Sequence, residues 1–159
     1  MKIKIGIGYD IHRLEENRKL YLGGIEIPFH KGLIGHSDGD VLIHAIIDAI
    51  LGALGEKDIG QLFPDTDPEY KGISSLKLLE KVIRIAKNKK AKILNIDSVI
   101  IAEEPKLSPY INSMKKILSY VLELEENSIG IKAKTNEGLG EIGEGKAIAT
   151  YAIALIEIE

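Results

Sequence analysis

The pattern of apolar and polar positions predicts four strands and one hairpin in this chain of 159 residues. Lys2 and Lys4 alternate with Ile3, Ile5 and Ile7, a period of two that is typical of a strand over residues 1–8. Similar reasoning predicts further strands over residues 91–104, 128–136 and 146–159. A hairpin is expected where two short apolar runs flank a Gly-Gly pair, at residues 19–22 and 25–28.

Helical periodicity predicts three helices, of which the first, over residues 36–54, is almost entirely apolar beyond Val41. Such a helix lacks a solvent face, so we expect it to be buried on most sides. Ser37 and Asp40 fit a capping signal at its start, and Gly55 fits a stop. Helices with one apolar stripe are expected over residues 74–89 and 109–124. The Gly-, Pro- and Asp-rich residues 55–68 are expected to form a loop.

Three polar residues interrupt the apolar first helix. Asp40, His44 and Asp48 are spaced four residues apart, which places them in one line along the helix. A titratable group in an apolar interior costs several kcal/mol or more unless it finds a partner. The line is therefore expected to meet a metal, a bound ligand or partner side chains.

Composition narrows the classes of function. With 21 basic and 24 acidic residues the formal charge is −3, and no basic block is present that would follow a nucleic-acid backbone. The absence of cysteine means that any metal must be held by histidine and carboxylate. No run approaches the roughly 18 apolar residues of a membrane helix. We expect one cytoplasmic domain over residues 1–159, with neither nucleic acid nor membrane as partner.

Two of the four histidines are candidate metal ligands. Asp10 and His12 are two residues apart, so in extended chain their side chains leave the same face. Together with His44 they would supply two imidazole nitrogens and one carboxylate oxygen, a set found at catalytic zinc sites. A buried His44 bonded to Asp48 without metal is an equal alternative. Of the other two histidines, His30 lies in an expected polar connector and is interpreted as solvated.

The residues His36-Ser37 are a second candidate site. They lie at the amino end of the expected first helix, where free N–H groups and the helix dipole favour phosphate or carboxylate. Simple capping, with an exposed His36, is the alternative interpretation. A metal set and an anion site about a helix apart would suit a phosphorylated substrate.

The segment Gly-Leu-Gly-Glu-Ile-Gly, residues 138–143, matches the dinucleotide-binding glycine pattern. That pattern needs a following helix, a second strand and an acidic residue about 20 positions later. Only 16 residues follow Gly143, and they are typical of a strand. We therefore reject a dinucleotide site and expect a flexible turn.

Four segments carry a resemblance to a known family: residues 6–14 (GIGYDIHRL), 23–28 (GGIEIP), 35–44 (GHSDGDVLIH) and 58–68 (DIGQLFPDTDP). They closely resemble the 2-C-methyl-D-erythritol 2,4-cyclodiphosphate synthase family, and the likeness extends over essentially the whole chain. The resemblance implies an α+β domain in which helices cover one face of a mixed four-stranded sheet, ferredoxin-like or chorismate-mutase-like, plus a small hairpin. It also implies a homotrimer with active sites between subunits.

The implied reaction belongs to the non-mevalonate isoprenoid pathway. The 2-phosphate of 4-diphosphocytidyl-2-C-methyl-D-erythritol 2-phosphate attacks its own β-phosphorus, which releases CMP and closes a cyclic diphosphate. By resemblance, Asp10, His12 and His44 are the zinc ligands, and Glu137 binds a second ion, magnesium or manganese, with the substrate diphosphate. His36 and Thr135 match residues that stabilise the transition state.

The resemblance also assigns substrate contacts. Besides Asp10 and His12, these are Ile11, His36, Ser37, Asp58, Ile59, Gly60, Phe63, Pro64, Asp65, Thr66, Asp67, Ala102, Glu103, Glu104, Pro105, Lys106, Leu107, Ser108, Lys134, Thr135, Asn136 and Glu137. Residues 102–108 match the cytidine pocket. Asp48 is expected to orient a ligand histidine. Glu141 and Glu144 stand where the family commonly has an aromatic residue and an arginine, so binding of isoprenoid diphosphates in a central trimer cavity is not implied.

Two other functions are compatible with the same residues. A zinc hydrolase would use metal-bound water, and it would need a general base near Asp10 and His12 that the sequence does not offer. A trimeric binding protein with a structural metal would usually need four protein ligands, and only three are evident.

Overall fold

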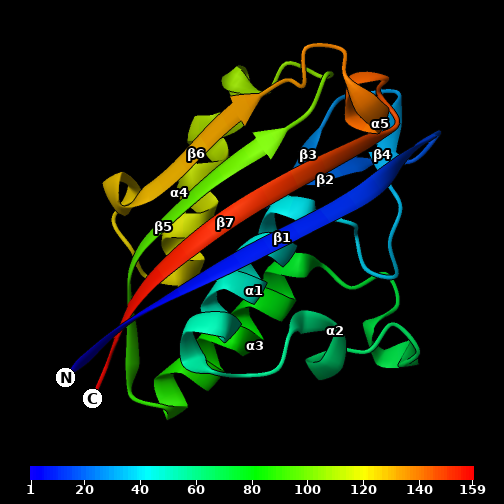
Figure 1. The fold of residues 1–159 in the computed structure, drawn as a ribbon. Helices are drawn as coiled ribbons and strands as arrows, with labels where there is room; N and C mark the ends of the chain where they lie inside the picture. Colours follow the sequence, from blue (N-terminus) through cyan, green and yellow to red (C-terminus); the bar gives the residue numbers. More distant parts are fainter.

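The computed structural model describes all residues from Met1 to Glu159 and is built on a five-stranded sheet (Figure 1). The strand order is β4-β1-β7-β5-β6, and only the β5–β6 pair is parallel. Their bounds are β1 Lys2–Glu16, β4 Lys31–Leu33, β5 Ala91–Ile101, β6 Ile129–Lys134 and β7 Ala147–Ile158. The predicted hairpin is confirmed as β2 Leu20–Leu22 paired with β3 Ile25–Ile27.

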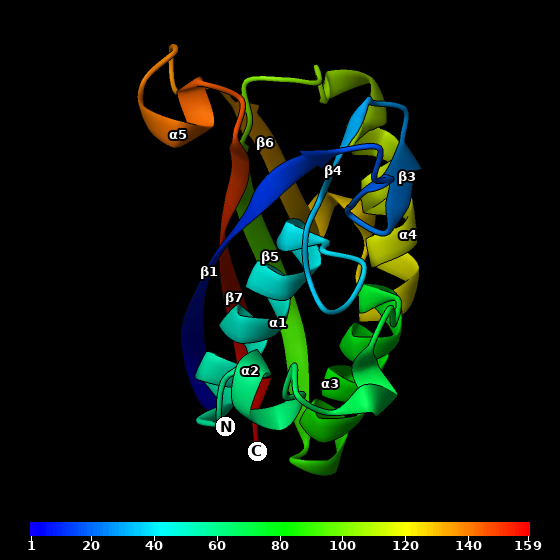
Figure 2. The ribbon, with the colours of Figure 1, turned by 90° about the vertical axis from the view of Figure 1, so that its right-hand side faces the viewer.

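Three long helices cover one face of this sheet (Figure 2). They are α1 Val41–Leu54, α3 Ser75–Asn88 and α4 Ile111–Leu122. Short helical turns are α2 Ile59–Leu62, α5 Gly140–Gly143 and the 3-10 turns Pro68–Tyr70, Ser108–Tyr110 and Glu126–Ser128. None of the helices has both the length and the apolarity needed to cross a membrane.

Helix α1 lies directly on the backbone of β1 because β1 has glycines on its inner side. A Cβ atom at Gly6 would stand 1.9 Å from the carbonyl oxygen of Ala49, and one at Gly8 would stand 1.9 Å from that of Ala45. With no side chains between them, the helix approaches the strand at the level of His44. From Val41 to Leu54 all but two residues of α1 are buried, as its apolar pattern predicts.

Along β1 and β7, the outer face of the sheet is apolar and exposed. Alternation along β1 sends every second residue away from the helices, and β7 contributes to the same face. The large apolar side chains exposed there are Ile3, Ile5, Ile7, Tyr9, Ile11, Tyr151 and Ile153.

Several predicted boundaries were wrong. The first strand continues to Glu16, so Asp10 and His12 lie within it, and the fifth strand β4 arises from residues expected to form a connector. Helix α1 begins at Val41, not at residue 36, because Asp40 is its N-cap. The loop expected over residues 55–68 contains α2, and the glycine-rich turn contains α5. The strand β7 follows that turn, which agrees with rejection of a dinucleotide site.

Asp40 takes the capping position because it serves two elements at once. Its carboxylate accepts hydrogen bonds from Ile43 N in α1 at 3.1 Å and from Gly23 N and Gly24 N in the hairpin at 3.0 and 2.8 Å. The side chain is fully buried, so these three donors satisfy a group that would otherwise be costly. The free N–H groups expected to bind phosphate at this helix end are thus partly used by Asp40.

Candidate active site

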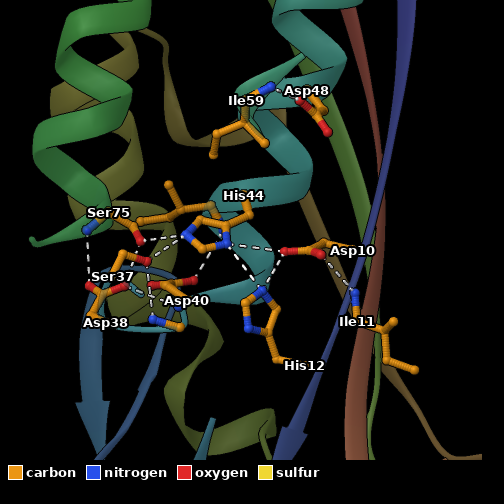
Figure 3. Close-up of polar contacts among 12 residues, drawn as sticks. Asp10, Ile11, His12, Ser37, Asp38, Asp40, His44, Asp48, Ile59 and Ser75 are labelled. Carbon is orange, nitrogen blue, oxygen red and sulfur yellow. Dashed lines mark hydrogen bonds and ion pairs between the residues drawn. The ribbon is translucent and has the colours of Figure 1, made fainter. Parts of the chain in front are cut away.

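Asp10, His12 and His44 form a compact triad (Figure 3). One ligand atom from each lies within 4.8 Å of the others. Nε2 of His12 is 2.8 Å from Oδ2 of Asp10, and Nδ1 of His44 is 3.1 Å from the same oxygen and 3.3 Å from Nε2 of His12. The structure therefore brings together the three residues that the sequence predicted as metal ligands, with Asp10 and His12 on one face of β1.

The outer nitrogen of each histidine is held by the protein. Nδ1 of His12 is 2.5 Å from the carbonyl oxygen of Ile34, which can only accept a hydrogen bond. Nε2 of His44 faces the hydroxyl oxygens of Ser37 at 3.1 Å and Ser75 at 2.9 Å. These contacts leave Nε2 of His12 and Nδ1 of His44 directed at the centre of the triad.

The charges in the triad favour a cation at its centre. Burial raises the pKa of Asp10, but the close contacts and charges of His12 and His44 outweigh it and lower the pKa to about 2. Burial lowers the pKa of His12, and the hydrogen bond and charge of Asp10 outweigh it, so the net shift is upward. Two ring nitrogens and a carboxylate oxygen that point at one another are compatible only with a proton or a metal ion between them. This donor set fits zinc with one open position.

The loop before α1 carries His36 and Ser37 next to the triad. Nε2 of His36 lies 3.0 Å from the carbonyl oxygen of Asp67, which joins this loop to the segment after α2. The guanidinium of Arg18 donates to the carbonyl oxygens of Leu33, Gly35 and Ser37 at 2.6, 3.4 and 3.3 Å. Sequence reasoning missed Arg18, because nothing in its local pattern indicates that it holds a distant loop.

A cavity of about 470 Å³ opens over the triad. It is lined by Asp10, His12, Gly35, His36, Ser37, His44, Ile59, Gly60, Phe63, Asp65, Tyr70 and Leu78. Tyr70 and Leu78 were not expected there. Among the predicted substrate contacts, Asp58, Pro64, Thr66 and Asp67 belong to the same loop but do not line the cavity, and the exposed side chain of Ile11 lies on the outer face of β1.

Residues 102–108 line a separate cavity of about 500 Å³, together with Phe29, Ala133 and Thr135. Phe29 was not anticipated. Lys134 alternates with Ala133 along β6 and so points to the other face of the strand. Asn136 and Glu137 also lie outside the lining: Asn136 N donates to Glu103 Oε1 at 2.7 Å, and Glu137 N donates to Thr135 Oγ1 at 3.2 Å. Within one chain, the predicted site is therefore divided into two halves.

Asp48 does not hydrogen-bond a histidine. Its Oδ1 atom accepts a hydrogen bond from the backbone N–H of Ile59 at 2.7 Å, at the first residue of α2. Burial raises the pKa of this carboxyl, partly offset by the bond from Ile59. Asp48 thus anchors the loop that carries Ile59 and Gly60 to α1, and the groups that hold His44 are Ser37 and Ser75 instead.

Comparison with known proteins agrees with this geometry. Residues 3–157 match the YgbB family. Two curated relatives named 2-C-methyl-D-erythritol 2,4-cyclodiphosphate synthase, from Clostridium acetobutylicum and Caldicellulosiruptor bescii, are 60% and 58% identical to this chain. The alignments cover 97% and 96% of this chain and 99% and 98% of the relatives. A solved structure of a 2C-methyl-D-erythritol-2,4-cyclodiphosphate synthase in a CDP-bound form has a TM-score of 0.90 and 41% identity, over 97% of this chain and 100% of that one.

Proposed function

Because the chain belongs to the YgbB family, we propose that its site carries out the CMP-forming cyclisation of the cyclodiphosphate synthases. The substrate is 4-diphosphocytidyl-2-C-methyl-D-erythritol 2-phosphate, and the products are 2-C-methyl-D-erythritol 2,4-cyclodiphosphate and CMP, in isoprenoid biosynthesis by the non-mevalonate route. One observation carries this proposal for the site: the ligand atoms of Asp10, His12 and His44 converge beside His36 and Ser37 in a single cavity.

The reaction needs positioning more than activation of a nucleophile. An oxygen of the 2-phosphate bonds to the β-phosphorus, the bond from that phosphorus to the bridging oxygen breaks, and CMP leaves with the electron pair. Since both reacting groups belong to one molecule, holding them in line can supply much of the rate enhancement. Asp10, His12 and His44 are proposed to hold zinc, which when bound would neutralise and orient phosphate oxygens.

Other residues are assigned supporting roles in this proposal. His36 and Thr135 would stabilise the negative charge that develops in the transition state, and Ser37 would contact the 2-phosphate. Glu137 would bind magnesium or manganese together with the diphosphate. The other substrate contacts, the single domain over residues 1–159 and the cytoplasmic location stay predictions.

We further propose a homotrimer in which the triad cavity of one subunit faces the residue 102–108 cavity of its neighbour. Two features support this arrangement: the two cavities share no lining residue, and β1 and β7 expose large apolar side chains on the outer face of the sheet. Apolar patches of this kind mark interaction surfaces. A closed ring would place a complete site at each of its interfaces.

The shared site can be tested by complementation. His44→Ala removes the zinc half of a site and Thr135→Ala the other half, so each variant alone is expected to have little activity. When the two are co-expressed and mixed trimers are isolated, about a third of the sites combine two intact halves. Cyclic diphosphate formation should recover to about that fraction of the wild-type rate.

The matched control is a double variant, His44→Ala with Thr135→Ala, co-expressed with the His44→Ala variant. No site in that mixture can contain an intact zinc half, so its activity should stay at background. If verified mixed trimers of the two single variants also stay at background, the proposed sharing of sites between subunits is wrong.

The activity itself is tested by incubating the protein with the cytidyl substrate, zinc and magnesium and identifying the products. CMP together with the cyclic diphosphate is the expected result. Linear phosphate products would instead indicate a hydrolase, and absence of turnover would contradict the proposal.

A further inference from the structure

The outer nitrogen of His44 contacts a buried hydroxyl that is itself bound to a carboxylate (Figure 3). Ser75, the first residue of α3, is fully buried, and its Oγ atom lies 2.9 Å from Nε2 of His44. The same hydroxyl donates to Oδ1 of Asp38 at 2.5 Å, and Ser75 N donates to Oδ2 of Asp38 at 2.9 Å. Asp38, Ser75 and His44 thus form a chain of hydrogen bonds that ends at the triad.

The positions of the protons along this chain follow from what each group can do. A carboxylate can only accept hydrogen bonds, so Asp38 takes the single hydroxyl proton of Ser75. The Ser75 oxygen then has only lone pairs to offer Nε2 of His44, which favours the tautomer with the ring proton on Nε2 and leaves a lone pair on Nδ1. Without a metal, Nδ1 lies 3.1 Å from Oδ2 of Asp10, which favours a proton on Nδ1 instead. The contact with Ser75 opposes that preference and keeps Nδ1 available to a metal.

We propose that Asp38 and Ser75 are positioning residues that fix His44 in the tautomer able to bind a metal through Nδ1. This inference rests on the proposed function only in taking the triad as the metal site. Hydrogen bonds to the second nitrogen of a ligand histidine orient the ring and make it a better ligand, and their loss typically lowers metal affinity about 10- to 100-fold.

The same two residues connect His44 to the loop that carries His36 and Ser37. Asp38 follows His36 and Ser37 in the chain, and its backbone N donates to the carbonyl oxygen of Ile73 at 3.1 Å. Gly72 N donates to the carbonyl oxygen of His36 at 2.7 Å. The loop before α1 is therefore hydrogen-bonded along the segment that leads into α3. Among these contacts, Asp38–Ser75 is the one that continues to His44.

The test uses Ser75→Ala, with Ser74→Ala as its control. Ser74 is the adjacent residue at the N-cap position of α3, and its side chain makes no capping hydrogen bond. The dissociation constant of zinc is measured by competition with a chelator, and the tautomer of His44 is read from nitrogen-15 NMR of the imidazole rings in zinc-loaded and zinc-stripped protein. Circular dichroism checks that each variant is folded.

For the wild type and Ser74→Ala, we expect the proton of neutral His44 to be on Nε2 and zinc affinity to be unchanged. For Ser75→Ala we expect a mixture of tautomers in the stripped protein and zinc binding weaker by about 10-fold or more. Ser37 Oγ, the remaining partner of Nε2, limits the loss, so Ser37→Ala combined with Ser75→Ala should show a larger one.

Asp38→Asn gives a second test that does not empty the Ser75 position. In one orientation the new amide can donate to the Ser75 oxygen, which frees the hydroxyl proton to donate to Nε2 of His44. The tautomer with the proton on Nδ1 should then gain population, and zinc affinity should fall. This shift of the preferred His44 tautomer from Nε2 to Nδ1 distinguishes the proposed role from a general loosening of the fold.

The proposal is overturned if folded Ser75→Ala and Asp38→Asn keep both the wild-type tautomer and the wild-type zinc affinity. If the wild-type triad binds no zinc at all, the proposed metal site fails. The NMR comparison of stripped wild type and variants still decides whether Asp38 and Ser75 set the tautomer, so the two failures can be told apart.

Discussion

Replacing His44 with alanine is expected to abolish stoichiometric zinc binding and cyclic diphosphate formation while the protein stays folded. His44 supplies one of only three protein donors in the triad. Loss of a residue that only hydrogen-bonds a ligand typically weakens metal binding about 10- to 100-fold, and loss of His44 itself should weaken zinc binding by more than that. Alanine suits the interior of α1, which favours a folded variant. The truncation leaves Ser75 and Asp10 short of a partner, which we expect to lower stability by about 1–3 kcal/mol.

The experiment measures zinc content, thermal unfolding and product formation in parallel. His30→Ala is the matched control, because His30 is exposed and pairs with Glu16 at 2.9 Å away from the triad. The control should keep its zinc and activity. Retention of one zinc per chain in His44→Ala would remove the metal assignment.

Replacing Gly8 with alanine is expected to cause a large loss of stability. The added Cβ would stand 1.9 Å from the carbonyl oxygen of Ala45. Neither atom can be moved by a side-chain rotation, so α1 must move away from β1. We expect a loss of about 3 kcal/mol or more in the free energy of unfolding. Because Ala45 follows His44, the same movement should widen the triad and weaken zinc binding.

Gly52→Ala is the control for this prediction. Gly52 lies in α1 on the same contact, but a Cβ there would be 3.8 Å from its nearest neighbour, the Cα atom of Gly6. Alanine in a helix is favoured over glycine by about 1 kcal/mol, so this variant should be neutral or more stable. Urea unfolding measures both variants. A Gly8→Ala protein as stable as the wild type would show that close approach of α1 does not position the triad.

Local patterns were sufficient to predict most elements but not where they begin and end. The alternation in residues 1–8 identifies β1, whereas Tyr9 to Glu16 are extended because they pair with β7 and β4. The three residues of β4 carry too short a pattern to be recognised. Helix α1 begins at Val41 because Asp40 also binds the hairpin, a contact between residues far apart in sequence.

The candidate site could be predicted only where the type and spacing of residues indicate a function. Asp10 and His12 are adjacent positions on one strand face, and His44 interrupts an apolar helix, so the sequence indicates all three as candidate ligands. Ser75 lies 31 positions from His44 in the chain, and an ordinary serine at a helix start gives no sign of such a contact. The separation of the two cavities depends on tertiary packing, which no local pattern records.

The central claim is that the triad and the adjacent loop perform a cyclisation and not a hydrolysis. Phosphorus-31 NMR of the reaction with the cytidyl substrate, zinc and magnesium tests it most directly, because it distinguishes a cyclic from a linear diphosphate. We predict that CMP and a cyclic diphosphate form in equal molar amounts, and that the resonances of neither product appear with His44→Ala. Linear phosphate products, or unchanged substrate with the zinc-loaded wild type, would contradict this account.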